Sequence, residues 1–389
     1  MVKIEVTKTE LVWPGKYNED GTRNEIPRLN LPFQVIECIN ESRATREANK
    51  GGKQSLLFDV YEGKEGETFE EGWTNKLIWG DNFLVMNSLL EKFAGKIDLI
   101  YIDPPFATGA DFSFKTEIGD DSIEIQKEQS VIEEKAYRDT WGRGIDSYVT
   151  MISERLKQIY ELLSPQGTLY IHLDWHVSSK IHLILEEIFS EDRIISEIIW
   201  QKIRVTKRQS SGFGNVHDYI YMCCKTENPI FNEQFKPFDE KYIKSHYKKD
   251  PKSGRMVQLV SMLQKGQGPA RRFGDLLIEP PSGMHWIWSQ ERIDEAMKNG
   301  RIQMTSGGRP RKVQYLDEMP GDVVDDLWTD IYPINSQAIE SLNYGTQKPE
   351  TLLERIIKAS SNPGSLVQYF QSNFSMSITS SSARTTKYL

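Results

Sequence analysis

The stretch Ile97-Asp98-Leu99-Ile100-Tyr101-Ile102, followed directly by Asp103-Pro104-Pro105-Phe106, decides the fold class of this 389-residue chain. Its first six residues are almost continuously apolar, as expected of a strand that is buried on both faces of a parallel sheet. The strand should end at Asp103, because two prolines in tandem supply no backbone N–H to a sheet ladder. Ligands of open α/β sheets bind at the carboxyl ends of the strands, so we expect a site at this turn.

The residue types at this turn suit a planar ring that carries an exocyclic amino group. Asp103 and the carbonyl of Pro104 can each accept one N–H of the amine, Pro105 stiffens the backbone, and Phe106 can stack on the ring. Two such acceptors draw the nitrogen towards a tetrahedral geometry and stabilise the positive charge that develops as it attacks an electrophile. An ordinary strand-to-loop turn is the alternative; the preceding strand and Phe106 both weigh against it.

Strands and helices alternate on both sides of this turn. The apolar patterns predict strands over residues 76–79, 97–102, 168–173, 197–202 and 218–225, and helices over 83–93, 148–163, 177–189 and from 350 onward. Such alternation predicts a parallel α/β sheet. It disappears between residues 205 and 330, where Gly-, Pro- and Trp-bearing segments predict an irregular inserted module.

The motifs of the chain resemble those of a known enzyme family. Asp-Pro-Pro-Phe at 103–106 is similar to the signature of amino-group DNA methyltransferases, in the variant that favours adenine over cytosine. Four further segments occur in the order of the circularly permuted β-class, which includes modification subunits of type III restriction systems: Leu77–Asn82, Gly167–Asp174, Asn215–Ile220 and Thr346–Glu350. The resemblance runs from Lys76 to Val367.

This resemblance implies a Rossmann-like, circularly permuted α/β sheet that uses S-adenosylmethionine to methylate adenine N6 in double-stranded DNA. It implies a catalytic set of Asp103, Pro104, Pro105 and Phe106. It also implies donor contacts from Asp81 and Asn82 at the adenine end and from Thr346, Gln347, Lys348 and Pro349 at the carboxylate end. Taken alone, Asp81-Asn82 would be a turn or a helix cap, and His172 and Asp174 would be satisfied polar groups at a strand end. We expect no metal site.

The same resemblance gives the expected domain organisation. Residues 1–70 form an N-terminal extension packed on the core, and residues 71–204 form the catalytic core. A target-recognition module spans 205–330 and interrupts the core, with 218–226 as a core strand. Residues 331–367 form the donor-binding loop and helix, and 368–389 an atypical, disordered tail.

One expected element is missing from the sequence. The resemblance implies an Asp-Pro-Phe-x-Gly-x-Gly turn beyond the strand that begins near Leu366, yet no glycine follows Gly364. We therefore expect an incomplete sheet without two central strands, from a truncated or frameshifted gene or from one half of a split enzyme. In the last case a companion chain supplies the loop. The chain alone should bind S-adenosylmethionine poorly.

Charge is distributed unevenly along the chain. The net charge is −8, but residues 201–255 contain 12 Lys and Arg against 6 Asp and Glu. A basic stretch in an acidic chain predicts a surface for phosphates, with Lys202, Arg204, Lys207 and Arg208 as DNA contacts. A solvated basic loop is the alternative.

Location and function complete the expectations. The sequence has no signal peptide and no apolar run of bilayer length, so we expect no membrane association. Cys38, Cys223 and Cys224 suit neither a zinc knuckle nor a disulfide framework, which predicts a reduced, cytoplasmic protein. The predicted function is adenine-specific DNA methylation, with a restriction subunit as a candidate partner. The rival is a catalytically dead DNA-binding or specificity protein, and RNA or cytosine-N4 methylation are lesser alternatives.

Overall fold

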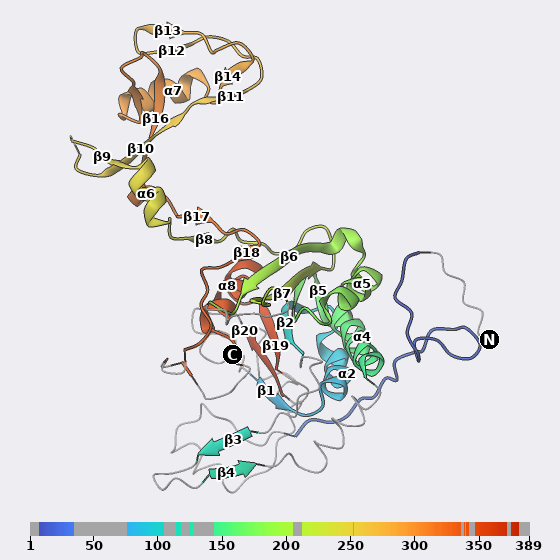
Figure 1. Ribbon diagram of the computed structural model, residues 1–389. Coiled ribbons are helices and arrows are strands. Elements are labelled where there is room, and N and C mark those ends of the chain that lie inside the picture. Colours follow the sequence, from blue (N-terminus) through green and yellow to red (C-terminus); the bar gives the residue numbers. More distant parts are fainter. Residues whose placement is uncertain are drawn as a thin grey trace, which may run out of the picture. The chain divides into compact units, whose positions relative to one another are not determined.

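The chain contains two compact units. A computed structural model describes residues 8–34, 76–104, 114–117, 124–127, 144–204, 212–251, 253–335, 338, 340–341, 347–371 and 375–380. The core unit comprises Met1–Gln234 and Asp325–Leu389, and the inserted unit comprises Phe235–Val324 (Figure 1). The inserted unit is narrower than the module predicted over 205–330, because residues on both of its flanks belong to strands of the core sheet.

The core unit is built on a mixed sheet of eight strands in the order β1-β20-β19-β2-β5-β7-β6-β18. Their bounds are β1 (Lys76–Trp79), β2 (Ile97–Asp103), β5 (Leu163–Leu173), β6 (Ile194–Gln201), β7 (His217–Cys224), β18 (Leu327–Trp328), β19 (Leu366–Gln371) and β20 (Ser375–Ser380). Strand β2 runs parallel to β5 and β19, and β6 runs parallel to β18. Strands β7 and β20 are antiparallel to both of their neighbours. The predicted α/β sheet is thus confirmed, with two reversed strands.

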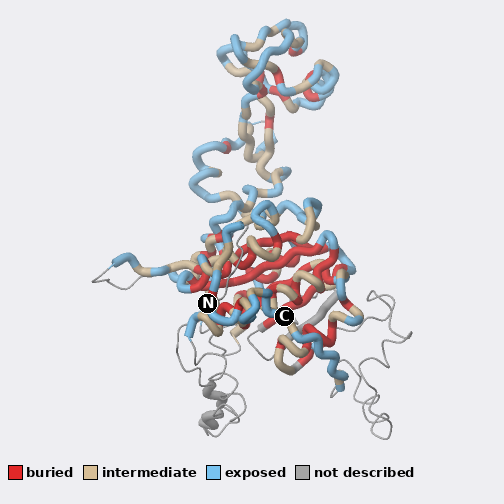
Figure 2. The backbone as a smooth tube through the Cα atoms, turned by 90° about the vertical axis from the view of Figure 1, so that its right-hand side faces the viewer, coloured by how far each residue is buried: buried red, intermediate tan, exposed pale blue. Residues whose placement is uncertain are grey.

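Helices cover both faces of this sheet. Helices α2 (Asn82–Phe93), α4 (Ile145–Leu162) and α5 (Ser178–Phe189) form one hydrophobic core with residues of β2 and β5, among them Ile100 and Ile171. Helix α8 (Glu350–Ser360) lies on the other face, where the hydroxyls of Tyr170 and Ser360 share a hydrogen bond of 2.8 Å. Buried positions follow the central strands (Figure 2). The chain makes a close approach at Gly167, where a Cβ would lie 2.7 Å from the carbonyl oxygen of Ile97.

The described part of the N-terminal extension, residues 8–34, contains no helix and packs against α4 and α5. The indole N–H of Trp13 donates to Thr150 Oγ1 on α4 over 2.8 Å. Lys16 Nζ donates to Glu10 and to Glu187 on α5, over 2.8 and 2.7 Å. These buried contacts hold residues 8–34 against the two helices.

Residues beyond Val367 correct one prediction. They were expected to form a disordered tail and to leave the sheet without two central strands, and this expectation is wrong for β19 and β20. Residues 367–371 pair in register with Leu99–Asp103 of β2, and β20 joins β19 to β1. The physical reason is that five of the seven residues of β2 are apolar and all but Asp98 are buried, so the strand needs a partner on each edge; β5 pairs one edge, and β19 with Leu366, Val367, Tyr369 and Phe370 pairs the other. Residues 381–389 lie outside the described residues.

The inserted unit contains short strands and two helices around a small core. Its elements are β8 (Phe235–Lys236), α6 (Glu240–His246), β9 (Lys248–Lys249), β10 (Met256–Ser261), β11 (Leu263–Lys265), β12 (Arg271–Phe273), β13 (Leu276–Ile278), β14 (Met284–Trp286), α7 (Gln290–Lys298), β15 (Ile302–Met304), β16 (Pro310–Tyr315) and β17 (Asp322–Val323). Strands β15, β16, β10 and β9 form one sheet, and the others pair two by two. Met262, Phe273, Trp286 and Ile293 are buried together. A separate pair, β3 (Phe114–Glu117) and β4 (Glu124–Lys127), belongs to the core unit.

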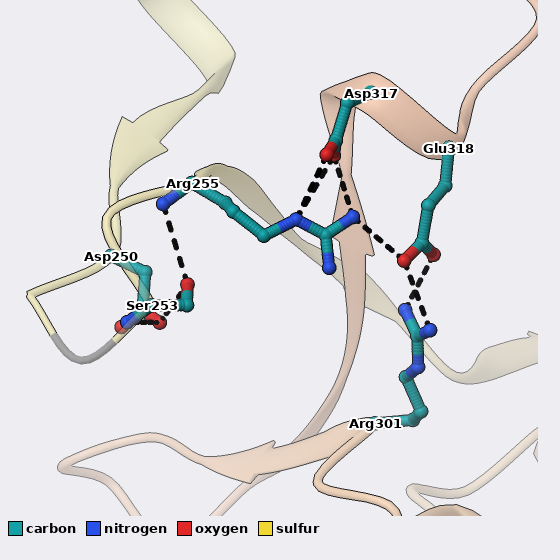
Figure 3. Close-up of polar contacts among 6 residues, drawn as sticks. All are labelled: Asp250, Ser253, Arg255, Arg301, Asp317 and Glu318. Carbon is teal, nitrogen blue, oxygen red and sulfur yellow. Dashed lines mark hydrogen bonds and ion pairs between the residues drawn. The ribbon is translucent and has the colours of Figure 1, made fainter.

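An exposed cluster of ion pairs braces the inserted unit (Figure 3). Arg255 Nη2 donates to Asp317 and Glu318, each over 2.7 Å, and Arg301 Nη1 donates to Glu318 over 2.5 Å. The hydrogen bonds from Arg301 and Arg255 lower the pKa of the Glu318 carboxyl to about 2. We call these four residues the exposed cluster; they join the start of β10 to the 3-10 turn η3 (Leu316–Glu318).

Candidate active site

Asp103 and Lys348 form a buried ion pair at the carboxyl end of β2. Lys348 Nζ lies 2.6 Å from Asp103 Oδ2, and the two side chains are 8% and 7% exposed. Lys348 lies just before α8, so the pair joins segments 245 residues apart in the sequence. Because an unpaired charge at this depth is costly, each of these side chains depends on the other.

A cavity adjoins this ion pair. Its polar lining comes from Asn82, Asp103 and Arg155, and its apolar lining includes Met86, Ile102 and Phe370. Pro104 also lines the cavity. A concave site with apolar walls and a few converging polar groups suits a flat ligand that has polar atoms at one edge.

Asp81 lies next to this cavity and caps the N-terminus of helix α2. Its Oδ1 accepts from the backbone N–H groups of Phe83 and Leu84, over 2.9 and 3.3 Å, and so caps α2. Its Oδ2 lies 3.4 Å from Arg155 Nη2. Asp81 thus forms the helix cap that the sequence offered as the alternative, and its predicted contact with the donor stays a prediction.

Arg155 is a site residue that the sequence reasoning missed. It lies on the buried stripe of α4 between Met151 and Ile159, one helical turn from each, and all three line the cavity. A charged residue at the spacing of an apolar stripe is the signal that could have found it. Its Nε is buried without a hydrogen-bond partner among the described residues.

A chain of hydrogen-bonded polar groups begins at Tyr101, two residues before Asp103; its members are buried except for Lys202, which is 29% exposed. Tyr101 Oη is 2.9 Å from His172 Nδ1, and His172 Nε2 is 3.1 Å from Asp218 Oδ2. Lys202 Nζ donates to Asp218 Oδ1 over 2.6 Å. We call Tyr101, His172, Asp218 and Lys202 the buried chain.

Burial and charge set the protonation of this chain. Burial lowers the pKa of the His172 imidazole, and the nearby Lys348 lowers it further. Burial alone would raise the pKa of the Asp218 carboxyl, but hydrogen bonds from His172 and Lys202 lower it below its usual value. Burial raises the pKa of the Tyr101 hydroxyl well above its usual value.

Two of the predicted DNA contacts have partners inside the core unit. Lys202 is bound to Asp218, as above. Arg204 Nη1 donates to Gln201 Oε1 over 3.0 Å, its Nη2 donates to the carbonyls of Thr329 and Ile331, and its guanidinium lies 4.1 Å from the centre of the Tyr332 ring. Lys207 and Arg208 lie outside the described residues.

The structure thus brings together part of the predicted site. Asn82, Asp103 and Pro104 line one cavity, and Lys348 pairs with Asp103. Gln347 Nε2 donates to the carbonyl of Glu340 over 2.6 Å, and Pro349 occupies the N-cap position of α8. Pro105, Phe106 and Thr346 lie outside the described residues.

Comparison with known proteins identifies the family. The DNA methylase family matches residues 97–368, which include the Asp103 turn, the buried chain and α8. The chain belongs to the DNA methylase family. The type II methyltransferase M.EcaI of Enterobacter cloacae is 30% identical over 344 residues, which cover 87% of this chain and 69% of M.EcaI.

Two type III relatives extend the comparison of this DNA methylase. The StyLTI Mod subunit of Salmonella typhimurium is 23% identical over 89% of this chain and 55% of its own length, and the EcoPI Mod subunit of Escherichia phage P1 is 24% identical over 88% and 60%. The chain therefore spans between 55% and 69% of the length of these three relatives. A solved complex of M1.HpyAVI with SAM aligns with 42% of this chain and 60% of that chain, at 18% identity and a TM-score of 0.26.

Proposed function

We propose that this chain transfers a methyl group from S-adenosylmethionine to the exocyclic amino group of adenine in double-stranded DNA. The observation that carries the proposal is the buried Asp103, which lies beside Pro104 at the carboxyl end of β2 and shares a cavity with Asn82. Membership of the DNA methylase family supports it. So do the names of the relatives, a type II methyltransferase and type III modification subunits.

Asp103 and Pro104 hold the target amine in this proposal. The adenine is flipped out of the duplex, at a cost of a few kcal/mol that stacking and phosphate contacts offset. The carboxylate of Asp103 and the carbonyl of Pro104 accept the two N–H groups, and Phe106 stacks on the ring. The nitrogen attacks the methyl carbon, a C–N bond forms as the S–C bond breaks, S-adenosylhomocysteine leaves, and the positively charged nitrogen then gives one proton to water. The two acceptors stabilise the positive charge that develops on the nitrogen.

Asn82, Arg155 and Lys348 bind the donor in this proposal. Asn82 and Arg155 offer polar groups in the cavity for the adenine end, with the Asp81 turn beside them. Lys348 is the cation for the donor's carboxylate. Because Lys348 also holds Asp103 Oδ2, a carboxylate that attracts Lys348 would release this oxygen for the target amine.

Donor binding should be weak. Residues 365–389 contain no glycine, so the segment after β19 lacks the Gly-x-Gly pattern that lets a backbone approach a ligand closely. In this proposal Asn82, Arg155 and Lys348 bind the donor without such a close backbone contact. We therefore expect methyl transfer to need a high donor concentration.

The inserted unit is the proposed DNA-recognition module. Residues 235–324 contain 16 Lys and Arg against 11 Asp and Glu, whereas the rest of the chain contains 32 against 45. Basic residues gathered in one unit of an acidic protein provide the footprint expected for phosphates. A restriction subunit as partner and a cytoplasmic location belong to the same proposal. No helix among the residues described by the structure is long and apolar enough to cross a membrane.

The test measures tritiated-methyl transfer to mixed-sequence duplex DNA over a wide range of donor concentrations. Hydrolysis of the product then separates N6-methyladenine from N4-methylcytosine, and we expect the former. Calorimetry with the donor should give weak binding. DNA binding without transfer at any donor concentration would instead favour a catalytically dead DNA-binding protein.

A further inference from the structure

Side-chain hydrogen bonds of the buried chain link residues that lie on, or directly after, four neighbouring strands of the core sheet. Tyr101 lies on β2, His172 on β5 and Asp218 on β7, and Lys202 directly follows β6. Tyr101, His172 and Asp218 are 2%, 0% and 2% exposed. The Trp200 ring packs edge-on against His172, with ring centres 5.5 Å apart.

The hydrogen bonds determine where the protons of this chain lie. Asp218 is ionised, because hydrogen bonds from His172 and Lys202 lower its pKa against the effect of burial, and a carboxylate only accepts. His172 Nε2 must therefore carry a proton and donate to Asp218 Oδ2. His172 is neutral, since burial lowers its pKa, so Nδ1 has no proton and accepts from the Tyr101 hydroxyl. Each hydrogen bond thus fixes the protonation of the next residue, in the order Lys202, Asp218, His172 and Tyr101.

The buried chain ends at Tyr101, which lies on β2 close to the proposed catalytic residue Asp103. Tyr101 lies two residues before Asp103 on β2, and its ring stacks on that of Tyr369 on β19, with ring centres 5.4 Å apart and an interplanar angle of 8°. The charged groups that face His172 are Asp218, Asp103 and Lys348. A substitution of His172 would therefore change both the position of the carboxyl end of β2 and the electric field at Asp103.

We propose that Lys202, Asp218 and His172 are positioning residues, which fix Tyr101 and, through it, the end of β2 that carries Asp103. Lys202 then acts inside the protein, on the position of the catalytic carboxylate, and not on a DNA phosphate. The part that concerns methyl transfer rests on the proposed function, whereas the tautomer and the contacts of His172 do not.

The neighbouring strand offers a matched control. Tyr170 pairs with Tyr101 in the β2–β5 register, is as deeply buried, and bonds to Ser360 over 2.8 Å. Each substitution removes one buried hydroxyl: Tyr101→Phe removes the hydrogen bond to His172, and Tyr170→Phe removes the hydrogen bonds to Ser360 and to Met222 Sδ. Both should lower stability by about 1 kcal/mol. Only Tyr101→Phe removes a contact to His172.

The first measurement is the imidazole 15N–1H spectrum of the full chain, with His172 assigned through His172→Gln. We expect a neutral ring protonated at Nε2, with a pKa below the usual value, that changes in Tyr101→Phe and not in Tyr170→Phe. A ring protonated at Nδ1, or one that titrates like a histidine in water, would overturn the proposal whatever the activity of the protein.

The second measurement is steady-state methyl transfer. Tyr101→Phe should lower kcat by up to about tenfold with little change in KM for the donor, and Tyr170→Phe should change neither by more than about twofold. His172→Gln, which keeps one donor and one acceptor, should retain more activity than His172→Leu. Equal losses of kcat in the two tyrosine variants would show that the buried chain has a structural role only. A wild-type chain without transfer would contradict both the proposed function and the positioning role, while the spectrum would still report on the contacts.

Discussion

The buried chain of the core unit and the exposed cluster of the inserted unit are built from the same chemistry. In both, a cation and a carboxylate approach within 2.5–2.7 Å. Their carboxylates differ in contact with water, since the side chain of Asp218 is 2% exposed and those of Asp317 and Glu318 are 62% and 39% exposed, whereas the cations Lys202 and Arg255 are similarly exposed, at 29% and 34%. Water and salt screen the exposed pairs, whereas in the interior the loss of one partner leaves a charge that nothing solvates.

A short ion pair is therefore no measure of importance by itself. The carboxyl with the pKa of about 2 is the exposed Glu318, where several hydrogen bonds from arginines add up. The buried chain holds its groups in defined protonation states behind a proposed catalytic residue. The exposed cluster should serve local geometry only. The following changes separate the two.

The largest difference should appear on removal of one carboxylate from each region. Asp218→Ala leaves the buried Nε2–H of His172 without its acceptor and the partly exposed Lys202 without its partner, and should lower the free energy of unfolding by about 1–3 kcal/mol. Asp317→Ala should change it little, because Arg255 is solvated and keeps Glu318. Urea unfolding of both variants measures this, and equal losses would contradict the comparison.

The second difference concerns pH. The pKa of His172 is lowered in the folded protein, so its contribution to stability is complete above the unfolded value of about 6.5 and is lost as pH falls from there through the folded pKa. The free energy of unfolding should therefore decline as pH falls below about 6.5, and less steeply in His172→Gln.

Glu318 provides the contrast to this pH effect. Its pKa of about 2 lies below the usual 4.5, so its contribution is complete above 4.5 and is lost between 4.5 and 2. Glu318→Gln should leave the slope of the curve above pH 4.5 unchanged and make the curve flatter between pH 4.5 and 2. A wild-type curve that is flat between pH 6.5 and 5, or identical in His172→Gln, would show that His172 has no lowered pKa.

The third difference concerns salt. Raising the ionic strength from 0.1 to 1 M shortens the Debye length from about 10 to about 3 Å. The effect of Arg255→Met on stability should vanish at the higher salt concentration, and the effect of Lys202→Met should persist because Asp218 is buried. Thermal unfolding at both salt concentrations measures this, and equal salt sensitivity would place Lys202 on the surface.

The smallest expected effect is on the salt dependence of DNA binding. Lys202→Met should leave the slope of log affinity against log salt unchanged, because Lys202 is bound to Asp218. The double variant Lys207→Met, Arg208→Met should reduce the slope by roughly 0.9 for each phosphate that the protein no longer neutralises. A reduction of that size in Lys202→Met would restore its sequence-based assignment as a DNA contact.

The sequence was sufficient where local pattern determines structure. The apolar run of β2, its end at Asp103 and the stripes of α2, α4, α5 and α8 followed from periodicity and from proline. Residues 368–371 and 375–380 were misjudged because the interpretation relied on the missing Gly-x-Gly motif, although the alternation of polar and apolar residues over Ser375–Ser380 is typical of a half-buried strand.

Long-range pairing explains what the sequence did not predict. His172 and Asp218 meet only because β5 and β7 are antiparallel in a register that joins His172 to Ile220. Lys202 looked like a phosphate contact because its basic neighbours are visible in the sequence, whereas its partner Asp218 lies across a strand pair. Arg155 left a local signal, a charge on an apolar stripe, that pattern reading passed over.

Asp103 at the end of β2 is the residue on which the proposed function depends most, because it is to hold the amine of a target adenine. The most direct test compares methyl transfer to duplex DNA by the wild-type chain and by Asp103→Ala, at the highest practical donor concentration, with DNA binding measured in parallel. We expect N6-methyladenine from the wild-type chain, and a loss of about 100-fold or more in Asp103→Ala with DNA binding retained. Equal transfer by the two proteins, or none by the wild-type chain, would contradict this role of Asp103.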